Sequence, residues 1–364
     1  MTSTPDFIPR WASAPGRTIL DVLDRRSQST QDLCAALHIS DHECDALLDG
    51  RKAITVEIAN GLSHFLGASS SFWLARDMQY RADVRRTAQD EWAQSLPVND
   101  LVHLGWMKRS SDWKQQIANC CDFFEVDGPE AWNDRYGGVQ DAGTLRTSRA
   151  IEGSVQAVSS WLRRCEIEAS AIPTSDWDAG KLEANLGTVR GLTKHRQPAS
   201  SLVQLRDLLA AVGVVVVLVR PPRGAPVSGA AWRDRAGRRV LALTARHLSD
   251  DHLWFTVMHE IGHLLLHGSA ATFVDQIEDG AATADWREVE ANAFAANALL
   301  PEVVRKGLRG QRVTRQTILG LSVQHGVAPG VVVGLLQHDE VVGYHQLNGL
   351  KRRYAWAGDV LAAK

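Results

Sequence analysis

The chain has 364 residues, of which 45% are hydrophobic and 23% are charged, and its formal net charge at pH 7 is -2. This length allows two or three domains of ordinary size, and this composition is normal for a globular protein with a sizeable core. The nearly balanced charge excludes a general attraction to nucleic acid or to anionic membranes. No apolar run approaches the roughly 18 residues that a membrane span needs.

The amino-terminal segment MTSTPDFIPRWASAPG has neither the basic region nor the apolar region of a signal peptide. The five cysteines are scattered, and no two form a C-x-x-C pair. This pattern argues against a disulfide framework or a cysteine zinc site, and it favours a reducing compartment. We therefore expect a cytoplasmic protein that does not engage a membrane.

The first half of the chain reads as a helical module followed by a connector. Residues 1–16 are rich in proline and serine and are expected to form a flexible arm, and residues 17–90 form an all-α domain. Apolar residues recur there at helical spacing in five short segments, with breaks that carry serine or glycine, which predicts a helix-turn-helix bundle. These segments are 18–26, 30–37, 41–50, 54–67 and 71–86.

Residues 91–200 are expected to form a helical connector. The segment WLRRCEIEA, residues 161–169, has helical spacing, whereas residues 127–147 are rich in glycine and aspartate and predict a loop.

Residues 201–340 are expected to form an α+β domain, followed by a tail over residues 341–364. The segments VVVVLVR (214–220) and RRVLALT (238–244) predict strands, with a turn at 220–226 between them. Helices are expected elsewhere in this domain, with a loop from about 268 to about 285. They are predicted at 201–213, 250–267 and 286–300, with two more between 313 and 337. The chain is thus predicted to be multidomain.

The segment WFTVMHEIGHLLLHG contains an H-E-x-x-H motif. On a helix, His259 and His263 are four residues apart and share one face, so that their two imidazoles can bind one Zn²⁺ ion. Glu260 lies beside the first ligand, too close to ligate the same ion but able to reach a water on it and act as general base. This spacing predicts a catalytic zinc site.

A catalytic zinc ion needs a third protein ligand, and the predicted helix WREVEANAFAANALLP offers Glu288. Asn292 lies on the same face as Glu288 and could hydrogen-bond a ligating histidine. Glu290 points about 200° away by helix geometry and is expected to be solvated. His267 is expected to cap the first helix or to support a ligand from outside the coordination sphere, rather than to bind the metal.

The H-E-I-G-H motif, together with E-x-E-A-N-x-F-A-A-x-x-L-L-P from Glu288 to Pro301, resembles the ImmA/IrrE family of metallo-endopeptidases. The resemblance covers about residues 200–340. It implies a gluzincin-like fold in which His259, His263 and Glu288 hold Zn²⁺ and Glu260 is the general base. It also implies a protein substrate, typically a helix-turn-helix repressor whose cleavage switches on a stress response or the genes of a mobile element.

Residues 17–90 resemble the Cro/C1-type (XRE) helix-turn-helix, nearest to the HigA antitoxin branch, through TQDLCAALHISDHECDALLDGRKAIT. Such a module places its second helix in the major groove. That helix is acidic here, and residues 1–95 carry 10 basic and 13 acidic side chains, which makes DNA binding doubtful. Candidate DNA contacts are Gln31, Ser40, Arg51 and Lys52. The alternative is a module for protein interaction or homodimerisation.

Two functions therefore remain open at the level of sequence. The first is a cytoplasmic zinc endopeptidase that cleaves a regulatory protein, a repressor or an antitoxin, in a stress, phage or mobile-element response. The second is an antitoxin-like transcriptional regulator whose peptidase-like domain acts as a sensor. The intact H-E-x-x-H motif with Glu288 favours the first, and the likeness to HigA favours the second. Cleavage of the chain by itself is a weaker third reading.

Overall fold

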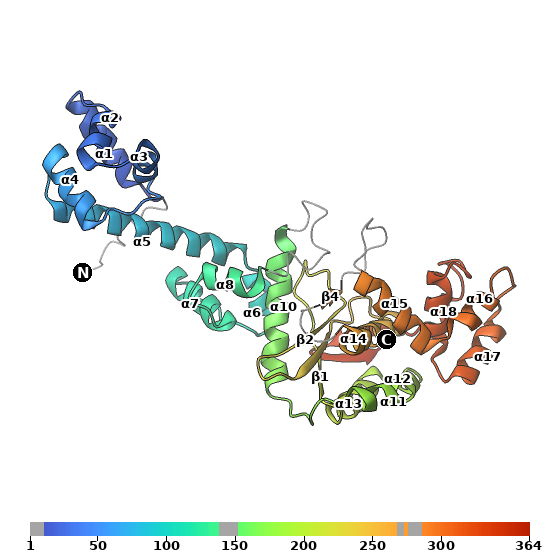
Figure 1. Ribbon diagram of the computed structural model, residues 1–364. Coiled ribbons are helices and arrows are strands. Elements are labelled where there is room, and N and C mark those ends of the chain that lie inside the picture. The colour runs from blue at the N-terminus through green and yellow to red at the C-terminus, as the bar shows by residue number, and fades with distance from the viewer. Residues whose placement is uncertain (1–10, 138–151, 268–272, 276–285) are drawn as a thin grey trace. The chain divides into compact units, whose positions relative to one another are not determined.

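A computed structural model describes residues 11–137, 152–267, 273–275 and 286–364. The chain divides into two compact units, Met1–Gln94 and Ser95–Lys364, and 61% of it is helical, with a small mixed sheet in the second unit (Figure 1). No single helix among the described residues is long and apolar enough to cross a membrane. Two consecutive helices bent by 111°, Arg315–His325 and Pro329–His338, reach that length and apolarity only when taken together.

The first unit is built from helices with well-defined starts. Ser29, Ser40 and Thr55 each precede a helix, and the side chain of each accepts a hydrogen bond from a backbone N–H of the first turn. The helices are α1 (Pro15–Arg25), α2 (Thr30–Leu37), α3 (Asp41–Leu48), α4 (Val56–Leu66) and α5 (Ser70–Ser95). All five predicted helices are present, but α5 extends well beyond the predicted end at residue 86. Residues 1–10 of the predicted arm lie outside the described part of the chain.

The core of this unit forms where α1, α2, α3 and α4 meet. Ile19, Leu33 and Leu62 are fully buried there, and the thiols of Cys34 and Cys44 lie in the same core. The short turn at residues 38–40 between α2 and α3 is made possible by the left-handed backbone of His38. Buried Gly16 of α1 lies against the backbone of Leu48, so that α1 and α3 approach closely.

We predict that Gly16→Ala will destabilise the first unit. A Cβ atom at residue 16 would lie 1.9 Å from the carbonyl oxygen of Leu48, so α1 and α3 would have to separate. Overpacking of this kind costs about 1–3 kcal/mol of unfolding free energy. Gly61→Ala is the matched control, because its Cβ would meet only the flexible end of Leu37. Hydrogen exchange of α1 and α3 amides should rise in the first variant only, and equal protection in both would contradict the prediction.

The second unit contains a four-stranded sheet surrounded by helices. The helices before the sheet are α6 (Val98–His103), α7 (Trp113–Phe124), α8 (Pro129–Tyr136), α10 (Glu152–Ser170), α11 (Ala179–Ala184), α12 (Leu186–Leu192) and α13 (Pro198–Ala210). Those that follow its first three strands are α14 (Asp250–Leu266), α15 (Trp286–Leu299), α16 (Glu302–Gly307), α17 (Arg315–His325) and α18 (Pro329–His338). The expected connector and α+β domain therefore lie in one compact unit.

The sheet has the strand order β1-β3-β2-β4. Its strands are β1 (Val214–Leu218), β2 (Gly229–Arg233), β3 (Arg239–Leu243) and β4 (Phe273–Asp275). The pair β1–β3 is parallel, whereas β2 pairs antiparallel with both β3 and β4. Every residue of β1 is buried, as expected for a strand with a continuous run of valines. One face of the sheet shares a core with α13, α14 and α18, and α10 also packs on β1.

Several sequence-based expectations for this unit were wrong. Residues 129–136 form α8 inside a stretch predicted to be loop, because Pro129 is suited to the first helical turn and Trp132 and Tyr136 are buried. Strand β2 was missed because GAAWR carries little β propensity, and its burial comes from the neighbouring strands. Strand β4 lies in the segment expected to be loop, and the rest of that segment is outside the described residues.

The strand predicted at residues 238–244 directly precedes the H-E-x-x-H helix, and this position led to the expectation that an extended substrate could pair with its edge. This expectation was wrong, because β3 is an inner strand with β1 on one side and β2 on the other. Among the described strands, β4 is outermost on the side of β2.

The tail expected at residues 341–364 holds the amino-terminal end of α14 in place. It forms a hairpin of β5 (Tyr354–Ala357) and β6 (Val360–Ala363). Just before it, the Lys351 ammonium lies 2.6 Å from the carboxylate of buried Asp251, and the backbone N–H of Arg352 donates to Asp250 Oδ1. Burial raises the pKa of Asp250 to about 6. These contacts fix the start of the helix that carries the H-E-x-x-H motif.

Candidate metal centre

Helix α14 carries the H-E-x-x-H residues through the middle of the core. Most of its residues are buried, including His259 and Glu260 at 0% exposure and His263 at 1%. Three polar side chains inside an otherwise apolar helix are costly to bury unless they have partners. The neighbouring helix α15 supplies partners for the two histidines.

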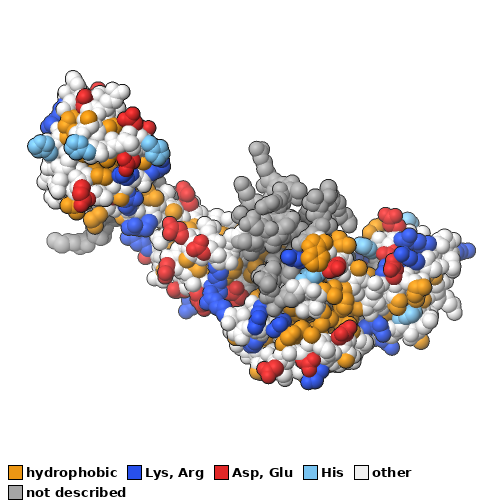
Figure 2. Space-filling view, viewed as in Figure 1, with side chains coloured by type: hydrophobic (Ala, Val, Ile, Leu, Met, Phe, Trp, Pro, Cys, Tyr) orange, Lys and Arg blue, Asp and Glu red, His pale blue; other side chains and the backbone are white. Residues whose placement is uncertain are grey.

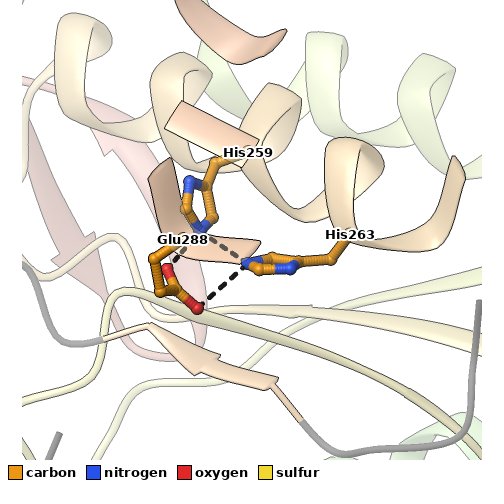
Figure 3. Close-up of side chains that lie close together, drawn as sticks. All are labelled: His259, His263 and Glu288. Atoms are coloured by element: carbon orange, nitrogen blue, oxygen red, sulfur yellow. Dashed lines mark hydrogen bonds and ion pairs between the residues drawn. The ribbon is translucent and has the colours of Figure 1, made fainter. Parts of the chain in front are cut away.

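Helix α15 packs closely against α14 because the residues between them are small. A Cβ at Gly262 would lie 3.4 Å from the Cα of Ala291, and both Ala291 and Ala295 are fully buried. This close approach brings Glu288 of α15 to the two histidines. Figure 3 shows the three side chains pointing toward a common centre, the histidines from one helix and the glutamate from another.

The facing atoms of these three residues lie close together. The Nε2 atoms of His259 and His263 are 2.9 Å apart. Carboxylate oxygens of Glu288 lie 3.2 Å from Nε2 of His259 and 3.3 Å from Nε2 of His263. Each residue thus offers one ligand atom, and all of these atoms lie within 4.8 Å of one another.

Hydrogen bonds on the far side of each imidazole set its tautomer. Nδ1 of His259 lies 3.0 Å from Oδ1 of Asn292, an acceptor, so Nδ1 carries the proton and Nε2 presents a lone pair. Nδ1 of His263 lies 3.0 Å from Nδ1 of His267, whose Nε2 donates to Glu290 across 3.1 Å. The chain from Glu290 through His267 therefore places a proton on Nδ1 of His263, and the Nε2 of this ring also faces the centre as a lone pair.

The pKa shifts of His263 and Glu288 also favour metal binding. Burial lowers the pKa of His263, which favours the neutral ring. Burial alone would raise the pKa of Glu288, but the adjacent imidazoles of His259 and His263 outweigh that effect and lower the pKa to about 2. Two neutral imidazoles and one carboxylate form a set of donors that suits a divalent cation.

Glu260 lies directly over the start of strand β2. A Cβ added at Gly229 would be 2.5 Å from Oε1 of Glu260 and 2.7 Å from the methyl group of Thr256. Only glycine leaves room there for the buried carboxylate, so Gly229 is a positioning residue that the sequence analysis missed. No motif marks this glycine, since the contact arises only when α14 crosses β2.

Three residues that surround the candidate ligands, Asn292, His267 and Glu290, form contacts that could be predicted only in part from the sequence. Asn292 contacts His259, and His267 both occupies the carboxyl-terminal cap of α14 and contacts His263. Glu290, expected to be solvated, has a side chain that is 55% exposed but also bonds His267. The sequence lacked a signal for this contact because it joins the ends of two different helices.

The candidate DNA contacts lie in the first unit and are partly engaged there. Ser40 caps α3 in a reciprocal bond with Glu43, and Lys52 pairs with the same glutamate at 2.6 Å. Arg51 pairs with Asp49 at 2.9 Å, and Gln31 is exposed on α2. Both basic residues of this set are thus paired with acidic residues of the same unit.

Comparison with known proteins supports a peptidase-like second unit. Residues 214–332 match a family model. It is Peptidase_M78, the IrrE N-terminal-like domain. The match includes α14 and α15, supports the ImmA/IrrE family for this segment, and points to a metallopeptidase. No curated protein and no solved structure matches the chain.

We predict a ranking of metal affinity among variants of α15. Glu288→Ala should weaken metal binding most, because it removes a facing oxygen at 3.2–3.3 Å from the imidazoles. Asn292→Ala should weaken it by about 10- to 100-fold, as is usual for a residue that orients a ligand. Glu290→Ala should have the smallest effect, because it acts through His267. Competition with a chelating dye would measure these affinities, and a larger loss in Glu290→Ala than in Glu288→Ala would refute the ranking.

Proposed function

We propose that the chain is a zinc-dependent endopeptidase that cleaves a regulatory protein, a helix-turn-helix repressor or an antitoxin, in the cytoplasm. In this proposal His259, His263 and Glu288 bind the metal and Glu260 is the general base. The observation that carries the proposal is the convergence of two imidazole lone pairs and a carboxylate on one point inside the core.

The spacing of the facing atoms fits zinc. Zn²⁺ binds nitrogen and oxygen ligands at about 2.0–2.2 Å, so a tetrahedral arrangement separates the ligand atoms by about 3.3–3.6 Å. The two separations that involve Glu288, 3.2 and 3.3 Å, lie near the lower end of that range, and the two Nε2 atoms, 2.9 Å apart, are somewhat closer. Three protein ligands also leave a fourth position for substrate or water, as catalytic rather than structural zinc sites do.

When bound, zinc supplies Lewis acidity, which lowers the pKa of water and polarises a carbonyl group. The protein's own residues would do the rest. Glu260 takes a proton from the attacking water and passes it to the leaving amine, and Gly229 keeps its carboxylate in place. Asn292 and the pair of His267 and Glu290 hold the imidazoles in the tautomers that metal binding requires.

Strand β4 supports a polypeptide as the substrate. It is the outermost described strand beside β2, and Gly229 of β2 lies both beneath Glu260 and opposite Asp275 of β4. An extended peptide that added to this edge would lie in the same sheet as Gly229. Such a substrate must be unfolded or exposed at the cleavage site, which limits cleavage to proteins with a mobile linker.

We expect Glu260→Gln to retain the metal and lose about 10²–10⁴-fold in proteolysis, because only proton transfer is removed. The test is co-expression of each enzyme form with helix-turn-helix proteins encoded nearby, with and without DNA damage or phage infection. A specific fragment should appear with the wild type and with Glu183→Gln, which changes an exposed glutamate outside the centre. Metal content should match in all three forms.

Two outcomes of that experiment would oppose the proposal. One is an identical fragment with Glu260→Gln and the wild type, which would show that Glu260 is not the base. The other is equal cleavage of unfolded casein and of every candidate, which would oppose a dedicated regulatory protease. Loss of the fragment together with loss of metal in Glu260→Gln would instead place Glu260 among the structural residues.

The charge of α3 bears on the alternative function, a DNA-binding regulator. Asp41, Asp45 and Asp49 recur at intervals of four residues and are all exposed, so the solvent face of this helix is acidic. Affinity for phosphates comes mainly from cations, and the two that follow α3 in the chain, Arg51 and Lys52, are paired with acidic residues of the same unit. These observations favour a role for the first unit in binding proteins.

We therefore predict weak or absent sequence-specific DNA binding at physiological salt. Fluorescence anisotropy with the chain's own promoter should show no saturable binding. Replacement of Asp41, Asp45 and Asp49 with asparagine should strengthen salt-dependent binding, since it removes repulsion from the phosphates. A nanomolar dissociation constant for the wild type, with a defined footprint, would contradict this prediction and support the regulator.

A further inference from the structure

A cavity lies in the same unit as the metal centre, and none of its lining residues belongs to that centre. Its volume is about 550 Å³, and it lies between α12 and the carboxyl-terminal end of α17. Its side chains are those of Arg190, Lys194, His195 and His325, and the rest of the lining is glycine. No carboxylate of the described residues lines the cavity, so the charge that it presents to a ligand is positive.

The cations of this cavity are available to a ligand. In the described part of the chain, neither Arg190 nor Lys194 has an ion pair with a carboxylate, and Nε2 of His325 is shielded from water without a hydrogen-bond partner. The carbonyl oxygens of residues 193–195, which could otherwise accept from these groups, are already bonded by the guanidinium of Arg352. An anion is the occupant that satisfies such a set.

Glycines keep the cavity open. Gly187 and Gly191 lie one helical turn apart on α12, on the same face as Arg190, and Lys194 follows the end of this helix. A Cβ atom at either position would meet nothing within 4 Å, so neither glycine is needed for close packing between elements. The space in front of them is within the range of about 300–1,000 Å³ that is usual for small-molecule sites. Figure 2 shows basic side chains over this part of the molecule, where Figure 1 places α12.

We propose that this cavity binds a small phosphate-bearing molecule of about the size of a mononucleotide. The planar fork of Arg190 and the mobile ammonium of Lys194 are suited to different oxygens of one phosphate, and the exposed imidazole of His195 can donate to the remainder of the ligand. The cavity is open to solvent, and its volume of about 550 Å³ matches that of a small-molecule site.

Residues in and next to the cavity lining form hydrogen bonds with the helices around the metal centre. Nη1 of Arg190 donates to the carbonyl oxygen of Ala298 near the end of α15, the helix that carries Glu288. Thr193, next to Lys194, accepts from the backbone N–H of Ala328 before α18, which packs on α14. Bound phosphate would hold α12, α15 and α17 together, so ligand binding should raise the melting temperature of the second unit.

The experiment is calorimetric titration of the full-length protein with inorganic phosphate and with adenosine monophosphate, repeated by thermal shift. Lys194→Gln removes an exposed charge, and Gly191→Leu fills the cavity without adding strain. Each should weaken binding at least tenfold. The matched controls are Lys108→Gln, an exposed lysine elsewhere in this unit, and Gly307→Leu, a helical glycine that also has nothing within 4 Å. Both controls should bind as the wild type does.

Additional measurements distinguish binding at this cavity from binding elsewhere on the protein. His259→Ala should bind the probes with unchanged affinity, which would exclude the metal centre as the site. The proposal would be overturned by the absence of saturable binding to the wild type, or by unchanged binding in Gly191→Leu. Equal affinity for citrate would overturn the specificity for phosphate. Tighter binding of a single-stranded oligonucleotide, lost in Lys194→Gln, would replace the small molecule with nucleic acid.

Discussion

The second unit is organised around one electrostatic constraint, the placement of two imidazole lone pairs and a carboxylate at 2.9–3.3 Å from one another inside a core. Electron-rich atoms at this separation repel each other unless a cation or a proton lies between them. The outer hydrogen bonds from Asn292 and His267 assign the ring protons to the far side of each histidine. The arrangement is therefore stable only with positive charge at its centre, which is the role proposed for the metal.

The packing around the centre follows from that constraint. Helix α15 must approach α14 closely enough for a glutamate side chain to reach both histidines, and Gly262 and Ala291 provide the closeness. On the opposite side, Gly229 provides the space for Glu260 over the sheet. The contact of Asp251 with Lys351 ties the start of α14 to a segment a hundred residues later in the chain. Helix α14 is thus held by residues far from it in the sequence: Ala291 and Gly229 lie against its sides, and Lys351 binds near its amino-terminal end.

The parts of this site that repeat at helical intervals could be predicted from sequence. The interval between His259 and His263 determines their shared face, and the same reasoning separates Glu288 from Glu290 on the next helix. The bond from Glu290 to His267 and the contact of Gly229 with Glu260 could not be predicted, because each depends on how separate elements cross. The strand order could not be predicted for the same reason. The sequence of β3 predicts a strand, but its position inside the sheet depends on its pairing with β1 and β2.

Local charge explains more of this molecule than its net charge of -2 does. Acidic residues gather on the exposed face of α3, whereas the charged side chains that line the cavity beside α12 are basic. An acidic helix repels phosphate and a basic cavity attracts it, within one nearly neutral chain. Anion recognition should therefore be sought at the cavity in the second unit rather than at the helix that resembles a DNA reader.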